Sequence, residues 1–300
     1  MAALGGVFAA AVTPRRQGPE IDLGAAFELL DFLCAAGISG VALLGSTGEF
    51  THFTIEERIR LVKLGVKRSR VPVVAGVSHS ALDGAVLLAH EAAAAGAAAL
   101  LVAPPYYFPY SQEEIRDFYL AFAEQAGDIP ILLYSVPQFA TRIEPETAAE
   151  LLATGAFAGI KDSSGSWPDF IRLKEAREAA PFSLLVGHDV LFTPARMAGA
   201  DGIISGVASA VPELVVALDR AITCGNRSAV ERLDALLQEF LRHMCSFAPP
   251  IAIREAVAAR GFTIGPHSVS FGAASARRLE AFREWFAGWL PVALEEAKHA

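Results

Sequence analysis

The sequence lacks an excess of positive charge, and this limits the partners that it can have. Its 25 Lys and Arg residues face 33 Asp and Glu residues, which gives a formal net charge of −8 at pH 7. Nucleic acids and anionic membrane surfaces bind clustered Lys and Arg. The basic pairs Arg15-Arg16 and Lys67-Arg68 are too short to form such a cluster. We therefore expect no nucleic-acid partner and no membrane partner.

Cysteine is scarce, and so are runs that could span a membrane. Cys34, Cys224 and Cys245 are odd in number, far apart and without a CxxC spacing, a usage typical of a reducing cytoplasm. The longest uncharged stretch, residues 92–109, is interrupted by two prolines and is poor in Leu and Ile, so it is a poor membrane span. The apolar N-terminus carries its charges after the apolar run, unlike a secretion signal, and is interpreted as a strand. A cytoplasmic protein is predicted.

Motifs for metals and nucleotides are missing as well. The seven histidines are scattered, no HxH, HExxH or Walker-type loop occurs, and no GxGxxG follows the first apolar run. Only His188-Asp189 places two possible metal ligands together at a predicted strand end, which is fewer than a metal site needs. We interpret this pair as substrate contacts or as a capped loop, and we predict no metal site.

What the sequence does contain is an alternation of apolar runs and helical segments. Segments such as 54–68 and 111–126 begin with Thr or Ser followed by Glu, and their apolar residues have helical spacing. The apolar runs between such segments are nearly continuous, which is typical of parallel strands buried on both faces. Eight of these runs lie at residues 5–14, 40–49, 71–78, 98–107, 129–137, 157–164, 182–189 and 201–209.

Eight units spaced by roughly 25 to 30 residues predict a closed (β/α)8 barrel, the TIM-barrel fold. The alternative, a doubly wound open sheet, is disfavoured by the missing GxGxxG and by the number of units. After residues 206–221 the alternation stops, and from about residue 226 the pattern indicates helices only. We therefore predict a barrel over residues 1–225 and a C-terminal helical annex of the same domain over residues 226–300.

Reactive groups in such a barrel lie at the C-terminal ends of the strands, and Lys161 in "FAGIKDSSG" stands at one of them. When apolar residues surround a lysine, its ammonium form is disfavoured and the free amine is a nucleophile toward carbonyl carbons. The alternative is that Lys161 pairs with Asp162 or extends its amine into water. Tyr134 ends the preceding run, so it either carries protons beside Lys161 or is an ordinary half-buried strand tyrosine.

The segment "GSTGE", residues 45–49, ends the second apolar run. It offers backbone N–H groups and the hydroxyls of Ser46 and Thr47 in a glycine-flanked turn, which suits a carboxylate or an oxyanion. The alternative is a plain glycine turn that precedes a capped helix.

Taken together, "GSTGE", "PPYY", "YSVP" and "GIKDSS", in this order at the second, fourth, fifth and sixth strands, resemble the dihydrodipicolinate synthase and N-acetylneuraminate lyase superfamily. The resemblance implies a (β/α)8 barrel and class I aldolase chemistry, with a covalent imine between Lys161 and pyruvate or another 2-oxo acid and no other cofactor. It implies that Tyr134 shuttles protons and that Ser46 and Thr47 hold the pyruvate carboxylate. It also implies that Tyr107 reaches across a subunit contact toward Ser46, in a homotetramer built from two dimers.

The sequence departs from the superfamily's patterns where the aldehyde partner would bind. Dihydrodipicolinate synthases of this kind have an arginine two residues after the proline of YxVP, where this sequence has Phe139. A phenyl ring cannot form a bidentate ion pair with a carboxylate. Arg142 would replace the arginine only if its loop folded back.

The lyase branch of the superfamily has a hydroxyl-binding set that matches in part. The residues that correspond are Ser163, Gly187, Asp189 and Ser205, with His188 beside them. A glutamate of the sialic acid lyases is replaced by Val190. We therefore expect a lyase that acts on a hydroxylated 2-oxo acid, of the 2-keto-3-deoxy sugar acid or 4-hydroxy-2-oxoglutarate type. The alternatives are 4-hydroxy-tetrahydrodipicolinate synthase, a 2-oxo acid dehydratase, and a catalytically silent binding protein.

Overall fold

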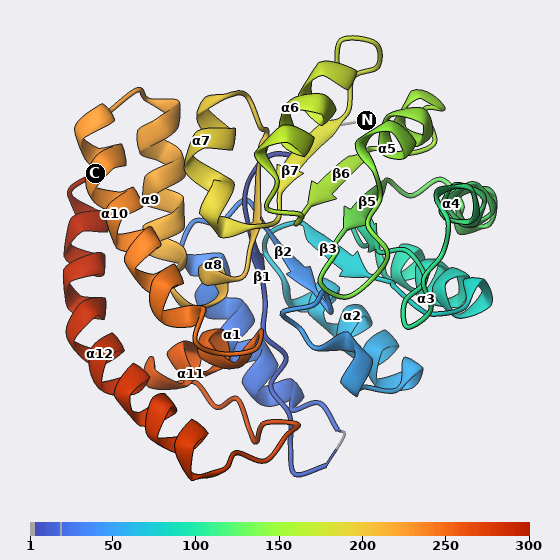
Figure 1. Ribbon diagram of the computed structural model, residues 1–300. Coiled ribbons are helices and arrows are strands. Elements are labelled where there is room, and N and C mark those ends of the chain that lie inside the picture. The colour runs from blue at the N-terminus through green and yellow to red at the C-terminus, as the bar shows by residue number, and fades with distance from the viewer. Residues whose placement is uncertain (1–3, 19) are drawn as a thin grey trace.

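The computed structural model of the protein describes residues 4–18 and 20–300, and its eight strands close into one parallel barrel (Figure 1). Each strand pairs with its neighbours in the sequence, and the first also pairs with the eighth. The predicted (β/α)8 barrel is therefore confirmed, and the open sheet is excluded. The strands are β1 (Gly6–Ala10), β2 (Gly40–Leu43), β3 (Val73–Gly76), β4 (Ala99–Val102), β5 (Ile131–Ser135), β6 (Gly159–Asp162), β7 (Ser183–Val186) and β8 (Gly202–Ser205).

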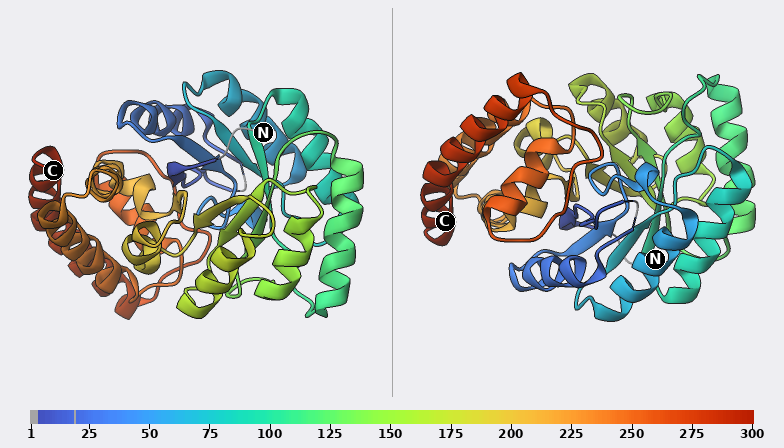
Figure 2. Two further views of the ribbon diagram at one scale, coloured as in Figure 1. Left: turned by 90° about the horizontal axis from the view of Figure 1, so that it is seen from above. Right: turned by 90° about the horizontal axis from the view of Figure 1, so that it is seen from below.

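The strands are buried on both faces, which explains why their sequences are nearly continuous in apolar residues. One cluster of buried residues, which includes Phe8, Leu101 and Leu132, fills the barrel interior. A second, larger cluster lies between the strands and the surrounding helices. The views from above and from below show helices around the strands (Figure 2).

The helices between the strands begin where their capping residues predict. Thr54 accepts a hydrogen bond from the backbone N–H of Glu57 at the start of α2, and Ser111 and Glu114 form a capping box at the start of α4. The helices up to β8 are α1 (Leu23–Ala35), α2 (Ile55–Arg68), α3 (Leu82–Ala95), α4 (Gln112–Ala126), α5 (Pro145–Ala153), α6 (Trp167–Ala176) and α7 (Phe192–Met197).

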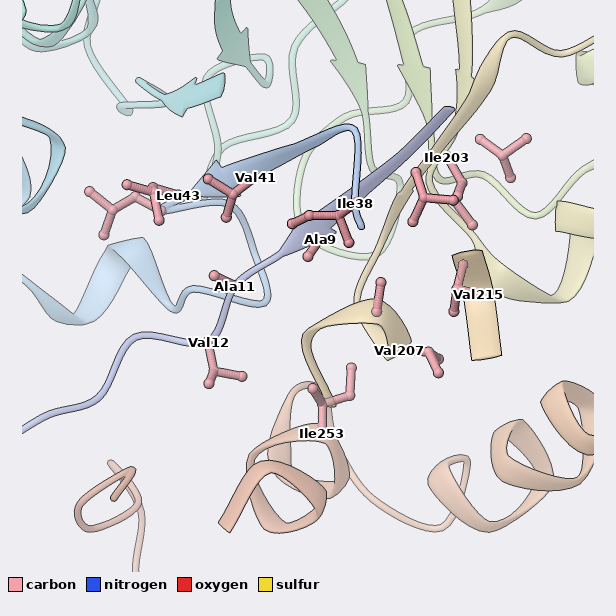
Figure 3. Close-up of a cluster of buried hydrophobic side chains, with 14 of the residues drawn as sticks. Ala9, Ala11, Val12, Ile38, Val41, Leu43, Ile203, Val207, Val215 and Ile253 are labelled. Atoms are coloured by element: carbon pink, nitrogen blue, oxygen red, sulfur yellow. The ribbon is translucent and has the colours of Figure 1, made fainter. Parts of the chain in front are cut away.

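After β8 the chain is helical, as predicted, and these helices cover one flank of the barrel (Figure 1). α10 and α12 pack against α9, and α11 packs against α8. Ile253 of α11 points toward Val207 of α8 within the outer hydrophobic cluster (Figure 3). Within the described residues, no helix is both long and apolar enough to cross a membrane. The helices of this region are α8 (Val207–Ala210), α9 (Pro212–Thr223), α10 (Arg227–Met244), α11 (Ile251–Ala259) and α12 (Ala273–Lys298).

Candidate active site

Lys161 of β6 stands directly opposite Tyr134 of β5 in the parallel ladder. Its side chain is 4% exposed, and its amine nitrogen lies 4.3 Å from the centroid of the Tyr134 ring. Lys161 lines a cavity of about 270 Å³ at the C-terminal ends of the strands. Asp162 accepts its side-chain hydrogen bonds from Ser164, and no hydrogen bond or ion pair to the Lys161 amine occurs within residues 4–18 and 20–300. The alternative of a Lys161–Asp162 pair is therefore wrong.

The phenol of Tyr134 is linked to the loop after β2. The hydroxyl oxygens of Tyr134 and Ser46 lie 3.1 Å apart and share a hydrogen bond. Ser46 and Thr47 both line the cavity of Lys161. A proton can pass between two hydroxyls at this distance, so the arrangement permits acid–base chemistry beside the amine.

The loop from Leu44 to Glu49 adopts a strained backbone. Leu44 and Glu49 have φ values of 58° and 51°, which are uncommon for residues other than glycine. A Cβ atom added to Gly76 of β3 would lie 2.1 Å from the carbonyl oxygen of Leu44, so only glycine lets the two segments approach. Surrounding contacts must hold such a backbone in place.

A second cavity of about 440 Å³ adjoins the first. The residues that line both cavities are Ser46, Tyr134, Val136, Gln138, Phe139, Pro249 and Pro250. Phe50 and Tyr106 also line the second cavity, and burial raises the pKa of the Tyr106 phenol above its ordinary value. Ser46 and Tyr134 therefore lie at the boundary between the two cavities.

The ends of β6 and β7 form a polar wall of the Lys161 cavity. The hydroxyl of Ser163 and the Nδ1 atom of His188 are buried there without a hydrogen-bond partner. A Cβ atom added to Gly187 would lie 2.1 Å from the Ser163 hydroxyl oxygen and 2.7 Å from Cε of Lys161. Glycine at this position therefore leaves room for the two side chains, and the two unpaired groups are available to a ligand.

Replacing Gly187 with alanine should reduce kcat/KM by about 10²-fold or more, because a new methyl group would displace the Lys161 side chain from its working position. The measurement is steady-state kinetics with the 2-oxo acids that the sequence resemblance implies, together with the rate of borohydride labelling in the presence of pyruvate. Gly288→Ala in α12 is the matched control, since a Cβ atom there meets nothing within 4 Å. Unchanged kinetics in Gly187→Ala would show that the neighbouring side chains adjust without consequence.

Asp189 and Ser205 form a buried hydrogen-bonded pair beside this wall. The Ser205 hydroxyl donates a hydrogen bond to the Asp189 carboxylate and accepts one from the backbone N–H of Ala208. Burial raises the pKa of the Asp189 carboxyl above its ordinary value, against the opposing effect of the Ser205 hydrogen bond. Asp189 lines the cavity, whereas Ser205 reaches it only through Asp189.

Phe139 lines both cavities with a side chain that is 50% exposed. The Arg142 guanidinium is 2.6 Å from the carboxylate of Asp169 in α6, and Arg142 is not among the residues that line either cavity. Arg142 therefore does not take the place of the missing arginine in this structure.

Tyr107 lies away from the other candidate residues. Its side chain is 86% exposed, its φ is 85°, and its ring packs edge-on against Phe108 at a centroid distance of 5.0 Å. It lines neither cavity of this chain. The predicted contact of Tyr107 with Ser46 of another subunit stays a prediction.

The contribution of the C-terminal helices to the cavity wall was not predicted from the sequence. The apolar spacing of these segments predicts helices but does not show which turn faces the barrel mouth. The one sequence feature that pointed to this region was "FAPPI", residues 247–251. Its two prolines interrupt the helical pattern of the C-terminal segment. The residues from this region that line the Lys161 cavity are Leu241, Met244, Cys245, Phe247, Ala248, Pro249, Pro250, Ala252 and Ile253.

Comparison with known proteins places this chain in a family. Residues 3–275 match the model of the dihydrodipicolinate synthetase family. A protein of Methanothrix thermoacetophila named 4-hydroxy-tetrahydrodipicolinate synthase is 33% identical over 262 residues, which cover 87% of this chain and 88% of that protein. One of the same name from Methanosphaerula palustris is 29% identical over 284 residues, or 93% of this chain and 97% of that protein.

Solved structures agree with the sequence comparison. The 4-hydroxy-tetrahydrodipicolinate synthase of Methylacidiphilum fumariolicum superposes with a TM-score of 0.88 at 27% identity, covering 98% of this chain and 99% of that one. A monomeric dihydrodipicolinate synthase variant gives a TM-score of 0.88 at 27% identity over 98% and 97% of the two chains. These findings confirm the resemblance on which the site was predicted. The chain belongs to the dihydrodipicolinate synthetase family, a family of class I aldolases.

Proposed function

We propose that this protein condenses the Lys161 amine with the keto carbon of pyruvate and performs aldol chemistry on the resulting imine. The observation that carries this proposal is a buried amine without an ion-pair partner, opposite a phenol at the mouth of the barrel. The amine displaces the keto oxygen as water, and the protonated imine then withdraws electrons from the neighbouring carbon. Borohydride reduction with pyruvate tests the proposal, and a stable adduct on Lys161 is the expected result.

Three further roles follow from the neighbours of Lys161. Tyr134 carries protons to and from the reacting carbons, and its hydrogen bond to Ser46 gives that proton a route away from the cavity. The strained loop presents the backbone N–H groups of Ser46 and Thr47 to the pyruvate carboxylate. Because the protein's own lysine supplies the amine that forms the imine, the proposed reaction uses no metal or organic cofactor.

Tyr107 would complete the proton route from a second copy of the chain. Its exposure of 86% and its edge-on contact with Phe108 leave the phenol free to enter another subunit. We propose a homotetramer made of two such dimers as the working assembly, in the cytoplasm. The monomeric variant among the similar structures makes the oligomeric state a point for direct measurement, by light scattering and by the activity of Tyr107→Phe.

For the aldehyde partner, the relatives favour aspartate semialdehyde. Those named above are called 4-hydroxy-tetrahydrodipicolinate synthases, at 29% and 33% identity. Their names support this reaction as the first candidate and do not support the sugar-acid substrate expected from the sequence. The first candidate predicts rapid consumption of pyruvate with aspartate semialdehyde.

A second candidate, cleavage of a short hydroxylated 2-oxo acid, is favoured by the chemistry of the cavity wall. Phe139 offers no charge to a second carboxylate, and Arg142 is held by Asp169. On the opposite wall, Ser163 and His188 have unpaired polar atoms, which would bind substrate hydroxyls. Gly187 makes room for the Ser163 side chain, and Asp189, which accepts a hydrogen bond from Ser205, lines the same cavity.

Replacing Phe139 with arginine separates the two candidates. If the protein cleaves hydroxylated 2-oxo acids, the variant should gain about tenfold or more in kcat/KM for aspartate semialdehyde, because a charge-assisted pair with its carboxylate contributes about 1.5–3 kcal/mol. If the wild type is already a synthase, the gain should be absent. Coupled assays with aspartate semialdehyde and with 4-hydroxy-2-oxoglutarate measure both activities, and Phe139→Leu controls for the change in side-chain shape.

A further inference from the structure

We propose that Arg254, in α11, is a positioning residue for the loop that binds the 2-oxo acid carboxylate, and that it acts through Glu49. This inference rests on the proposed function and assigns part of it to a residue outside the barrel strands. Under this proposal α11 positions a loop of the site, in addition to packing against the flank of the barrel.

The Arg254 guanidinium is fully buried and joins three segments of the chain. Its Nη1 atom donates hydrogen bonds to the Glu49 carboxylate at 2.7 Å and to the Thr13 carbonyl at 3.1 Å. Its Nη2 atom donates to the carbonyls of Ile264 and Pro266 at 2.9 and 3.1 Å. Arg254 is 0% exposed and Glu49 is 7% exposed. A planar guanidinium with several partners fixes the direction of each partner.

Glu49 is the final residue of the loop that carries Ser46 and Thr47. Its backbone N–H donates to the Ser46 carbonyl at 3.0 Å, and its φ of 51° is unfavourable for a residue with a side chain. Such a conformation persists only where surrounding contacts hold it. The ion pair with Arg254 is a contact of this kind, and it acts three residues from Ser46.

A second residue of the same helix, Ile253, lies near Thr47 of this loop. A Cβ atom added to Gly206 would lie 2.7 Å from Cδ1 of Ile253 and 3.2 Å from Oγ1 of Thr47. Ile253 and Thr47 therefore approach the same point, which the glycine leaves free. Figure 3 shows Ile253 directed from α11 toward α8. α11 thus lies near the loop at Thr47 and contacts it directly at Glu49 through Arg254.

Loss of the pair should weaken binding of a carboxylate more than binding of a neutral ketone. Backbone N–H groups bind an anion only when they converge on it, so a small displacement of the loop removes that preference. A general loss of packing would affect both ligands alike. The ratio between an anionic and a neutral ketone therefore distinguishes positioning from stability.

The experiment uses Arg254→Met and Glu49→Gln with pyruvate and with pyruvamide, which lacks the negative charge. Borohydride labelling, followed by intact mass, gives the concentration of each ketone at half-maximal labelling. We expect the value for pyruvate to rise about tenfold or more in both variants, and the value for pyruvamide to change by less than about threefold. Arg254→Lys, which keeps the charge, should recover part of the pyruvate affinity.

Glu213→Gln is the matched control, because Arg260 at the end of α11 forms a bidentate pair with Glu213 at 2.7 Å. It should lower Tm without changing the value for pyruvate. If Arg254→Met and Glu49→Gln lower Tm but keep the wild-type value for pyruvate, the inference is wrong. If Arg254→Met does not fold, Glu49→Gln decides alone. If the wild type forms no adduct with pyruvate, the proposed function itself fails.

Discussion

Replacing Lys161 with methionine should reduce turnover of every 2-oxo acid by about 10⁵-fold or more, to the level of the uncatalysed reaction. In the proposed mechanism the amine forms the covalent intermediate, and the described residues include no other lysine in the wall of the cavity. Methionine has a similar length and suits the buried position, where Lys161 is 4% exposed. Steady-state kinetics and borohydride labelling with pyruvate measure the two consequences, and labelling should vanish together with turnover.

The matched control for this substitution is Lys174→Met in α6, an exposed lysine that lines neither cavity. It should retain wild-type turnover and labelling. Circular dichroism and Tm establish that both variants are folded. If folded Lys161→Met turns over pyruvate-derived substrates at a rate near the wild type, the imine mechanism is refuted, and the roles given to Tyr134 and Ser46 lose their basis.

Replacing Tyr134 with phenylalanine should lower kcat by about 10²- to 10⁴-fold, the range for loss of a general acid–base group. The variant loses only the hydroxyl that is 3.1 Å from Ser46, while the ring beside the Lys161 amine remains. The imine should therefore still form, more slowly, so prolonged borohydride labelling should reach the wild-type extent. Retained labelling with lost turnover is the result that identifies a proton carrier.

Tyr119→Phe provides the control for removal of a buried phenol. Tyr119 is fully buried in α4, and its hydroxyl donates a hydrogen bond to the carbonyl of Val102 at 2.8 Å. Its loss should cost about 1 kcal/mol of stability and leave kcat unchanged. A Tyr134→Phe variant that behaves like Tyr119→Phe, with a lower Tm and normal turnover, would show that Tyr134 has a structural role.

The fold was predictable because burial on both faces of parallel strands leaves a direct trace in the sequence. Each of the eight apolar runs contains one strand, although the strands are only four or five residues long. The caps at Thr54 and Ser111 were predictable for the same reason, since a local hydrogen bond requires a local residue type. The boundary of the C-terminal annex at residue 226 stays a prediction, because α9 and α10 pack together across it.

The site was predictable only where it depends on the strands. Lys161, Tyr134 and Ser46 lie together because strand ends in a barrel converge, a rule that needs no contact information. The pairing of Arg254 with Glu49 joins residues more than 200 positions apart, and no local pattern specifies it. The same holds for Arg142, whose pairing with Asp169 depends on how the loop between β5 and α5 packs against α6.

The pairing of Tyr134 with Lys161 in the parallel ladder fixes the spacing of phenol and amine, whereas residues on the loops after the strands are free to vary. Adjacent strands lie about 4.8 Å apart, and a slip of one residue would turn a side chain to the opposite face of the sheet. The spacing of phenol and amine is thus fixed by backbone hydrogen bonds, whereas Phe139 and His188 stand on the segments beyond the strands. Under the proposed function, mutation of those segments can exchange one aldehyde for another over evolutionary time without disturbing the proposed covalent step.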